Sequence, residues 1–436
     1  PRKKAPYRHC NRGILRVSRK TSSFQAEERK GTQMSYVIKA TLLGIIPEEP
    51  EPVTVCFPIP DEQYDRTIDR LSQARMDHAT STNCTVSKLD SGYFVLAPLK
   101  GALVNVDQLD YLAKRLDSFD EGEAAQFQAM ACKMSIRSLK DFINLTFCCQ
   151  RATVIADFND LEQAGRDHRM NLNGGVLSAE EAKLLDGRKE ALQLIQSGAG
   201  TITPFGVVYD NGMRLEQLYD GKHFPPYLYD AYPLVLEASS KQAPEEKPEY
   251  LYLPATQRQI ERALCRAGVT SDADLQLQIA MNQLPEQTAA ALDLADLTSG
   301  DLPSLNQMCR AIKPLALQDR QKLDAAVQMA QPQDADEVRF LAENLEQFTF
   351  VPGIHSPKEY GEYLVKESGE FCYDEKLDGL YDYPQCGLRR LEEEKGQFSS
   401  LGYIAYRGSL TLEELMREDP AEQYQREQAL QMGGPV

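Results

Sequence analysis

The sequence contains no tryptophan, only five histidines and no apolar run long enough to span a bilayer. Without tryptophan the chain lacks a usual anchor at membrane interfaces, so we expect no membrane association. The ten cysteines have no regular spacing, and a chain of 436 residues can bury enough apolar surface without a disulfide framework. These absences together predict a soluble protein of the reducing cytoplasm.

Positive charge is also in deficit, with 48 Lys and Arg against 65 Asp and Glu, a formal charge of -17. Ten of the basic residues and two of the acidic ones fall in residues 1–33, which leaves 63 acids and 38 bases, a net of -25, for residues 34–436. Direct nucleic-acid binding is disfavoured, because it requires neutralisation of phosphates. We expect residues 1–33 to be a disordered or non-native extension outside the fold.

Residues 238–249 combine small and charged residues with two prolines, which is typical of a linker. We therefore expect a first lobe at 34–237, a second lobe at 250–424 and a tail at 425–436. Several residues recur at a displacement of 196: Pro58 and Pro254, Gly165 and Gly361, Gly206 and Gly402, and Gly212 and Gly408. Because Gly and Pro fix backbone shape, this register predicts a tandem duplication.

Each lobe shows strand patterns near its ends and helical patterns between them. Apolar runs at 53–57 and 249–253 stop at a proline and lead into amphipathic helices, and the turn Asp210-Asn211-Gly212 predicts a closing hairpin. Helical stripes occupy the middle of the first lobe: Leu109, Leu112, Ala113 and Leu116; Phe127, Met130 and Ala131; and Leu139, Phe142 and Ile143. We predict an elongated α+β protein of two related lobes, each with short terminal strands and a small helix bundle.

Motifs for catalysis are missing. The five histidines are His9, His78, His168, His223 and His355, and no two have the four-residue spacing of a helical metal site. The segment 373–383 lacks the ligand spacing of a calcium loop, and Cys148-Cys149 is more typical of a core than of a redox centre. We expect no catalytic residue, metal or cofactor, and a hydrolase with diverged motifs is the weakest alternative.

Acidic residues form rows on or beside predicted helices, and carboxylates three or four positions apart on a helix lie side by side. The candidate partner-binding residues are Asp107, Asp110, Asp117, Asp120, Glu121, Asp157, Asp160, Glu359, Glu362, Glu367 and Glu370. Such rows are usually solvated helix faces. At about 1.7 Å of duplex per charge, however, an excess of 25 charges equals about 40 Å of DNA.

The motifs LDYLAKRLDSFDEGEAAQFQAM, LYDGKHFPPYLY, LEQFTFVPGIHSPKEYGEYLVKESG and EEEKGQFSSLGYIAYRG resemble those of ArdA-type antirestriction proteins of conjugative elements. The resemblance covers both lobes. It implies an acidic DNA mimic, without enzymatic activity, whose partner is a type I restriction-modification enzyme. It also implies either a homodimer or an intrachain pseudo-dimer. The alternative is a non-catalytic acidic scaffold or regulatory partner in a conjugative element.

Overall fold

The computed structural model describes residues 36–45 and 51–417. The expected extension at 1–33 and the tail at 425–436 lie outside these residues. The chain divides into two compact units. Unit 1 holds the described residues up to Ala231, with 247–249 and 256–269, and unit 2 holds the rest. The structure confirms the predicted α+β class, since helices accompany four small antiparallel sheets.

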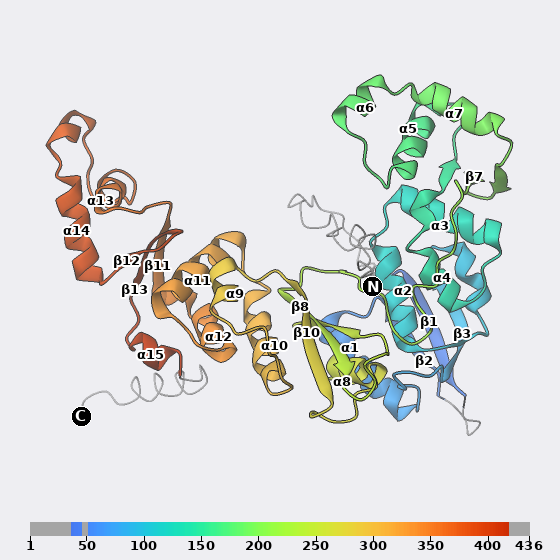
Figure 1. The fold of residues 1–436 in the computed structure, drawn as a ribbon, viewed down its shortest axis with the longest axis horizontal. Coiled ribbons are helices and arrows are strands. Elements are labelled where there is room, and N and C mark those ends of the chain that lie inside the picture. The colour runs from blue at the N-terminus through green and yellow to red at the C-terminus, as the bar shows by residue number, and fades with distance from the viewer. Residues whose placement is uncertain (1–35, 46–50, 418–436) are drawn as a thin grey trace, which may run out of the picture. The chain divides into compact units, whose positions relative to one another are not determined.

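Unit 1 contains a sheet of order β2-β1-β3-β4, a helical block, a sheet of order β5-β7-β6 and one helix from later in the chain (Figure 1). Its elements are β1 (Ile38–Gly44), β2 (Val53–Phe57), α1 (Asp61–Gln73), β3 (Cys84–Ser91), η2 (Phe94–Leu99), β4 (Leu103–Val104), α2 (Val106–Asp117), α3 (Glu121–Met134), α4 (Leu139–Leu145), η3 (Cys149–Arg151), β5 (Thr153–Ile155), α5 (Leu161–Leu172), α6 (Ala179–Leu184), α7 (Gly187–Gln196), β6 (Thr201–Thr203), β7 (Gly206–Tyr209) and α8 (Gln257–Arg266).

The described part of unit 2 contains a sheet of order β10-β8-β9, four helices, a sheet of order β11-β13-β12 with a further helix pair, and a short last helix. Its elements are β8 (Leu234–Ser240), β9 (Glu249–Leu253, of which Glu249 is grouped with unit 1), β10 (Leu275–Asn282), α9 (Glu286–Ala290), α10 (Asp301–Ile312), α11 (Leu317–Ala330), α12 (Ala335–Glu343), η4 (Leu345–Gln347), β11 (Phe348–Pro352), α13 (Pro357–Lys366), η5 (Glu375–Leu380), α14 (Tyr383–Glu394), β12 (Gln397–Phe398), β13 (Gly402–Tyr406) and α15 (Leu412–Leu415).

The apolar stripes predicted for the first lobe form the core of unit 1. All ten of their side chains are buried on α2, α3 and α4. The N-caps of the three helices are Asn105, Asp120 and Ser138, whose side chains accept hydrogen bonds from backbone N–H groups that would otherwise lack partners. Cys148 and Cys149 are also buried in this core, as predicted.

The elements of the second half repeat those of the first. The pairs β1 and β8, β2 and β9, α1 and α8, α3 and α11, α4 and α12, α5 and α13, and α7 and α14 each begin 196 positions apart. The sheet order β2-β1-β3 has its counterpart in β9-β8-β10. This order of elements supports the predicted duplication.

Backbone details also recur. The peptide bonds before Pro58 and Pro254 are both cis, and Gly206 and Gly402 both have positive φ, at 121° and 149°. A Cβ on either glycine would collide with a backbone carbonyl of the neighbouring strand, at Ile155 in the first copy and at the matching residue of β11 in the second. Both copies therefore require glycine at this position.

Two predictions are wrong: the linker at 238–249 and the closing hairpin at 210–212. The segment 238–249 is not a linker between lobes, because it overlaps β8 and β9 and contains the loop that joins them. Its small residues suggested a linker, but Ser240 is buried and donates a hydrogen bond to Asp274 (2.8 Å). The second repeat thus begins at β8, which the sequence did not predict, and the first repeat likewise begins at β1.

The hairpin predicted at Asp210-Asn211-Gly212 is also wrong. Asn211 and Gly212 do have the expected positive φ, but residues 213–233 contain no strand; the hairpin joins β6 to β7 instead. The Asn211 side chain donates to the carbonyl of Arg151 (2.6 Å) and to the hydroxyl of Thr153 (3.0 Å). The turn is therefore fixed to β5.

Candidate functional site

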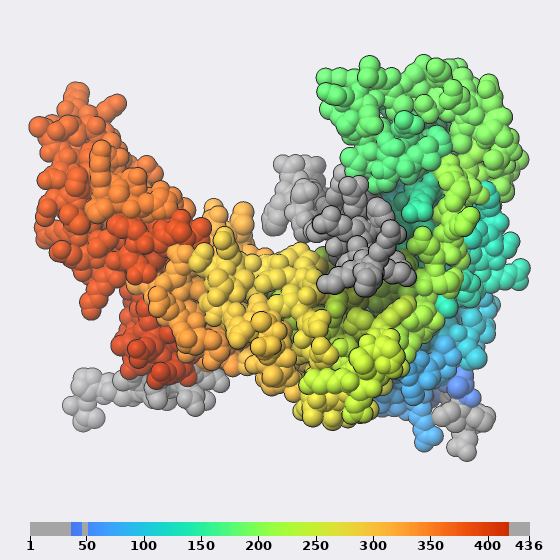
Figure 2. All heavy atoms as spheres, viewed as in Figure 1, coloured from blue at the N-terminus to red at the C-terminus, as the bar shows by residue number. Residues whose placement is uncertain are grey.

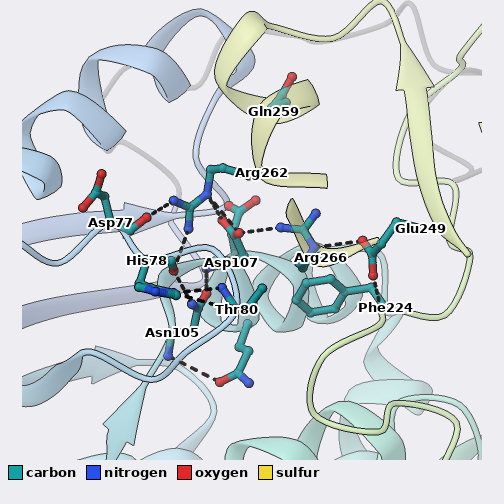
Figure 3. A network of polar contacts seen from close by, with 12 residues as sticks. Asp77, His78, Thr80, Asn105, Asp107, Phe224, Glu249, Gln259, Arg262 and Arg266 are labelled. Atoms are coloured by element: carbon teal, nitrogen blue, oxygen red, sulfur yellow. Dashed lines mark hydrogen bonds and ion pairs between the residues drawn. The ribbon is translucent and has the colours of Figure 1, made fainter. Parts of the chain in front are cut away.

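Four charged side chains of unit 1 form a buried polar cluster, which we call the central ion cluster: Asp107, Glu249, Arg262 and Arg266 (Figure 3). Asp107 lies on α2 and the two arginines lie on α8. The Asp107 carboxylate accepts from Arg262 Nε (3.0 Å) and Arg266 Nη1 (2.7 Å). Glu249 accepts from Arg266 Nε (2.8 Å). The central ion cluster therefore contains two positive and two negative side chains, and its formal charges cancel.

Asn105 and neighbouring backbone groups surround the central ion cluster. Asn105 caps α2 and donates to the carbonyls of His78 (2.6 Å) and Ser81 (2.9 Å), which fixes the loop after α1. Arg262 donates to the carbonyls of Asp77 and His78 of the same loop (Figure 3). The cluster therefore joins α2, α8 and this loop within unit 1.

All four charged side chains of the central ion cluster are largely buried, so the attraction between opposite charges is stronger than at the surface. Burial raises the pKa of the Glu249 carboxyl, although Arg266 opposes this shift. Burial also raises the pKa of Tyr64, whose hydroxyl donates to Asp107 (3.0 Å). Because each charge has an opposite partner, the cluster is suited to holding α8 in place rather than to proton transfer.

Two of the eleven candidate surface residues are not on the surface, which corrects that prediction for them. Asp107 belongs to the central ion cluster, and Asp110 is buried on the same helix. Asp110 accepts from the amide of Ile59 (2.7 Å) and pairs with Lys114 (2.8 Å). Burial raises the pKa of the Asp110 carboxyl, although Lys114 opposes the shift. A carboxylate in this position cannot present charge to a partner.

The structure brings other candidates together. Asp120 caps α3 and accepts from the Glu123 amide (2.8 Å), while Asp160 caps α5 and accepts from the Gln163 amide (3.1 Å). Burial raises the pKa of the half-buried Asp167 carboxyl, the hydrogen bond from Gln163 (2.8 Å) opposes this shift, and the negative charges of Asp160 and Asp120 add to it. We call Asp120, Asp160 and Asp167 the α3–α5 acidic cluster.

The other candidates of unit 1 differ in exposure. Glu121 and Asp157 are exposed, and Asp157 accepts from the backbone and side-chain nitrogens of Asn159 (both 2.8 Å). Asp117 is half-buried and accepts from the hydroxyl of Tyr229 (2.7 Å). Glu121 is the first residue of α3 and follows the N-cap Asp120, so it adds to the negative side-chain charge at the N-terminus of that helix.

The four candidates of unit 2 lie on or just after α13. Glu359 is exposed and accepts from the His355 amide (2.7 Å), which lowers the pKa of its carboxyl. Glu362 Oε1 lies 3.8 Å from Lys358 Nζ, and Glu370 forms an ion pair with Arg390. Glu367 is exposed at the end of α13. Their charges are thus partly compensated by local partners.

Sequence reasoning missed the partners of Asp107. The recurrence at 196 positions relates Arg262 and Arg266 to Arg66 and Arg70, but the second pair is exposed on α1. The sequence contains no signal that one pair is buried and the other is not. The contact with Asp107 spans 155 positions of the chain and depends on tertiary structure.

A second polar cluster lies in unit 2 around Glu394. Its carboxylate accepts from the hydroxyls of Tyr360 (2.8 Å) and Tyr403 (2.6 Å) and pairs with Arg407 (2.7 Å). The two tyrosine rings are stacked, with centroids 3.8 Å apart. This arrangement connects α13, α14 and β13, since each partner comes from one of these elements or lies directly after it.

Comparison with protein-family models and with curated protein sequences gives no match to this chain. Among residues 36–45 and 51–417, no three His, Cys, Asp or Glu side chains are grouped so that they could hold a metal ion. Within the described part of the chain, no helix combines the length and apolarity that a membrane crossing requires.

Proposed function

We propose that this chain is a non-catalytic antirestriction protein that imitates the charge of DNA and occupies the DNA-binding site of a type I restriction-modification enzyme. The observation that carries the proposal is the α3–α5 acidic cluster. Asp120 caps α3, Asp160 caps α5 and Asp167 lies on α5, and the negative charges of Asp160 and Asp120 add to the burial that raises the pKa of Asp167. Such crowding creates a local negative potential, which a basic groove would relieve.

The rigidity of these groups supports the proposal. Asp120 and Asp160 are helix N-caps, so one oxygen of each carboxylate is held by a backbone amide. Glu359 is held in the same way by the amide of His355. Charges fixed before binding lose little conformational entropy in a complex, which favours affinity for a target with a complementary array. Direct binding to nucleic acid is disfavoured by the same charges.

The test is inhibition of DNA cleavage by a purified type I restriction enzyme at several salt concentrations. We expect inhibition that weakens steeply as salt rises, because charge neutralisation drives the complex. The test variant neutralises four exposed charges and keeps both caps, since Asn also caps helices. It carries Asp120→Asn, Glu121→Gln, Asp157→Asn and Asp160→Asn. We expect a loss of inhibition of roughly tenfold or more.

A matched control removes four exposed acids elsewhere: Glu51→Gln, Glu62→Gln, Asp272→Asn and Asp319→Asn. This control should inhibit nearly as well as the native chain. Equal inhibition by the two variants would show that only total charge matters. Undiminished cleavage in the presence of excess native protein would overturn the proposal and favour the acidic scaffold instead.

A further inference from the structure

The second repeat leaves open a sheet edge that the first repeat closes. In unit 1 the strand β4 pairs antiparallel with β3, with Cys84 opposite Val104 and Thr85 opposite Leu103. In unit 2 the counterpart of β3 is β10, and within residues 36–45 and 51–417 no strand pairs with its outer edge (Figure 1). An edge strand directs N–H and C=O groups outward, where they can pair with another chain.

β10 has few of the features that usually prevent such pairing. Natural edge strands are protected by charged side chains, by proline or by bulges. β3 carries Lys88 and Asp90 in the part that β4 does not cover. The sequence of β10, LQLQIAMN, contains no charged residue and no proline. Its bulge lies at Ala280, where the register with β8 shifts, so residues 275–279 form a regular edge.

The side chains of β10 differ between the two faces of the sheet. Leu277 is buried and Ile279 is partly buried, whereas Gln278 between them is exposed. In Figure 2 the yellow segment of the chain that contains β10 reaches the surface. An added strand would therefore place apolar side chains beside Leu277 and polar ones beside Gln278. β4 has this alternation in the first repeat, since Val104 is buried and Leu103 is 57% exposed.

The charge beside this edge is negative. Glu237 on β8 lies opposite Gln278, and the exposed Asp272 lies just before β10. Neither carboxylate has an ion-pair partner among the residues that the structure describes. One base, Lys241, lies near the start of β10, where its Nζ donates to the carbonyl of Ala273 (3.1 Å). Two acids and one base favour an added strand that carries lysine or arginine on the Gln278 face.

We propose that β10 binds an extended segment of a partner protein, which adds antiparallel to residues 275–279 as a further strand. Main-chain hydrogen bonds supply the affinity, and alternate side chains supply the specificity. Apolar side chains of the segment lie toward Leu277 and Ile279, and basic ones lie toward Gln278 and Glu237. β4 is the template, because it makes the same addition to β3 within the chain. The site consists of β8 and β10 of unit 2 and does not depend on the proposed antirestriction role.

The first experiment titrates the full chain with a capped peptide of about six residues in which valine and lysine alternate. We expect saturable binding that slows amide hydrogen exchange within residues 275–279. The control peptide has the same side chains with every amide N-methylated, and it should bind roughly tenfold more weakly or worse, because it has no N–H donors.

Three outcomes of this titration would overturn the proposal. The first is unchanged exchange in β10 at saturating peptide, and the second is equal binding of the two peptides. The third is slow exchange in β10 that depends on the concentration of the chain without peptide, because the occupant would then be a second copy.

The second experiment changes the charge at the edge. Gln278→Lys should raise the dissociation constant of the valine-lysine peptide about two- to fivefold, because it places like charges opposite each other across the added strand. Gln278→Glu should lower the constant by a similar factor. The control Gln318→Lys adds the same charge at an exposed position of α11 and should leave the constant nearly unchanged. Equal effects at positions 278 and 318 would show that only net charge matters, which would contradict binding at β10.

Discussion

Asp110 and Asn306 make the same hydrogen bond in the two repeats. The side-chain oxygen of Asp110 accepts from the Ile59 amide at 2.7 Å, and that of Asn306 accepts from the Ala255 amide at 2.7 Å. Asp110 lies on α2 and Asn306 lies on α10. Each accepts from a backbone amide in the short connection between a strand and the helix that follows it. One copy uses a carboxylate and the other an amide, so the fold requires the acceptor oxygen and not the charge.

Replacing Asn306→Ala should destabilise unit 2 by about 1 to 3 kcal/mol, because it leaves the buried Ala255 N–H without its acceptor. Amide hydrogen exchange at Ala255 should accelerate accordingly. The control is Gln307→Ala, an exposed position of the same helix, where exchange should stay as it is. Equal exchange in the two variants would show that the bond contributes nothing.

Apolar periodicity predicted the helices and the core well, because burial of a stripe is a local property of the sequence. The same periodicity indicates which acidic residues of α2 lie on its buried face. Asp110 lies four positions after Val106 and three before Ala113, which places it on the buried face of the helix. Residue type alone suggests that an acid is exposed, whereas its position on the helix decides whether it is.

The partners of buried acids could not be predicted, because they come from distant segments. Asp107 needs Arg262 and Arg266, which belong to the second repeat in sequence and to unit 1 in space. The strand β8 escaped prediction for a similar reason. Its polar end at Ser240 is stabilised by Asp274, a contact that no local pattern shows.

Removing the charge of Asp107 should weaken the attachment of α8. Asp107→Asn leaves Arg262 buried without an acidic partner and leaves Arg266 with Glu249 alone. Breaking a buried pair on one side typically costs about 3 to 5 kcal/mol. We expect faster amide exchange along α8 and new protease cleavage there.

The control is Asp69→Asn on α1. This variant removes an exposed ion pair (3.2 Å) between Asp69 and Arg258, which lies on α8. An exposed pair contributes at most about 1 kcal/mol, so exchange along α8 should change little. If both variants loosened α8 equally, burial of the central ion cluster would not be what holds the helix.

The close contact of α5 with α7 depends on glycine. Gly165→Ala should destabilise unit 1 by about 1 to 3 kcal/mol, because the new methyl group would overlap the carbonyl of Gly187 and force the helices apart. Chemical denaturation checks this value. Gly122→Ala in α3 is the control: its Cβ would meet only the side chain of Asp120, at 3.3 Å, and should be neutral or slightly stabilising. Comparable losses of stability in the two variants would exclude the close packing of α5 and α7 as the cause.

Asp378 fixes the segment between α13 and α14. It accepts from the hydroxyls of Tyr383 (2.6 Å) and Tyr373 (2.9 Å) and pairs with Lys366 (2.9 Å). The hydrogen bond from Tyr383, followed by those from Lys366 and Tyr373, lowers the pKa of its carboxyl from 3.8 to about 2. The charged form is therefore the one that the folded segment favours.

This shift sets the pH range in which the segment should loosen. Because the folded pKa lies below the unfolded one, the stabilisation is present above about pH 4 and is lost as pH falls toward 2. Tyrosine ring signals of Tyr373 and Tyr383 in NMR spectra should shift with pH in that window. Asp378→Asn should abolish the pH dependence, whereas Asp374→Asn, which keeps an acceptor at the start of η5, should preserve it. Ring signals that titrate identically in native chain and Asp378→Asn would exclude this carboxylate as the group that holds the segment.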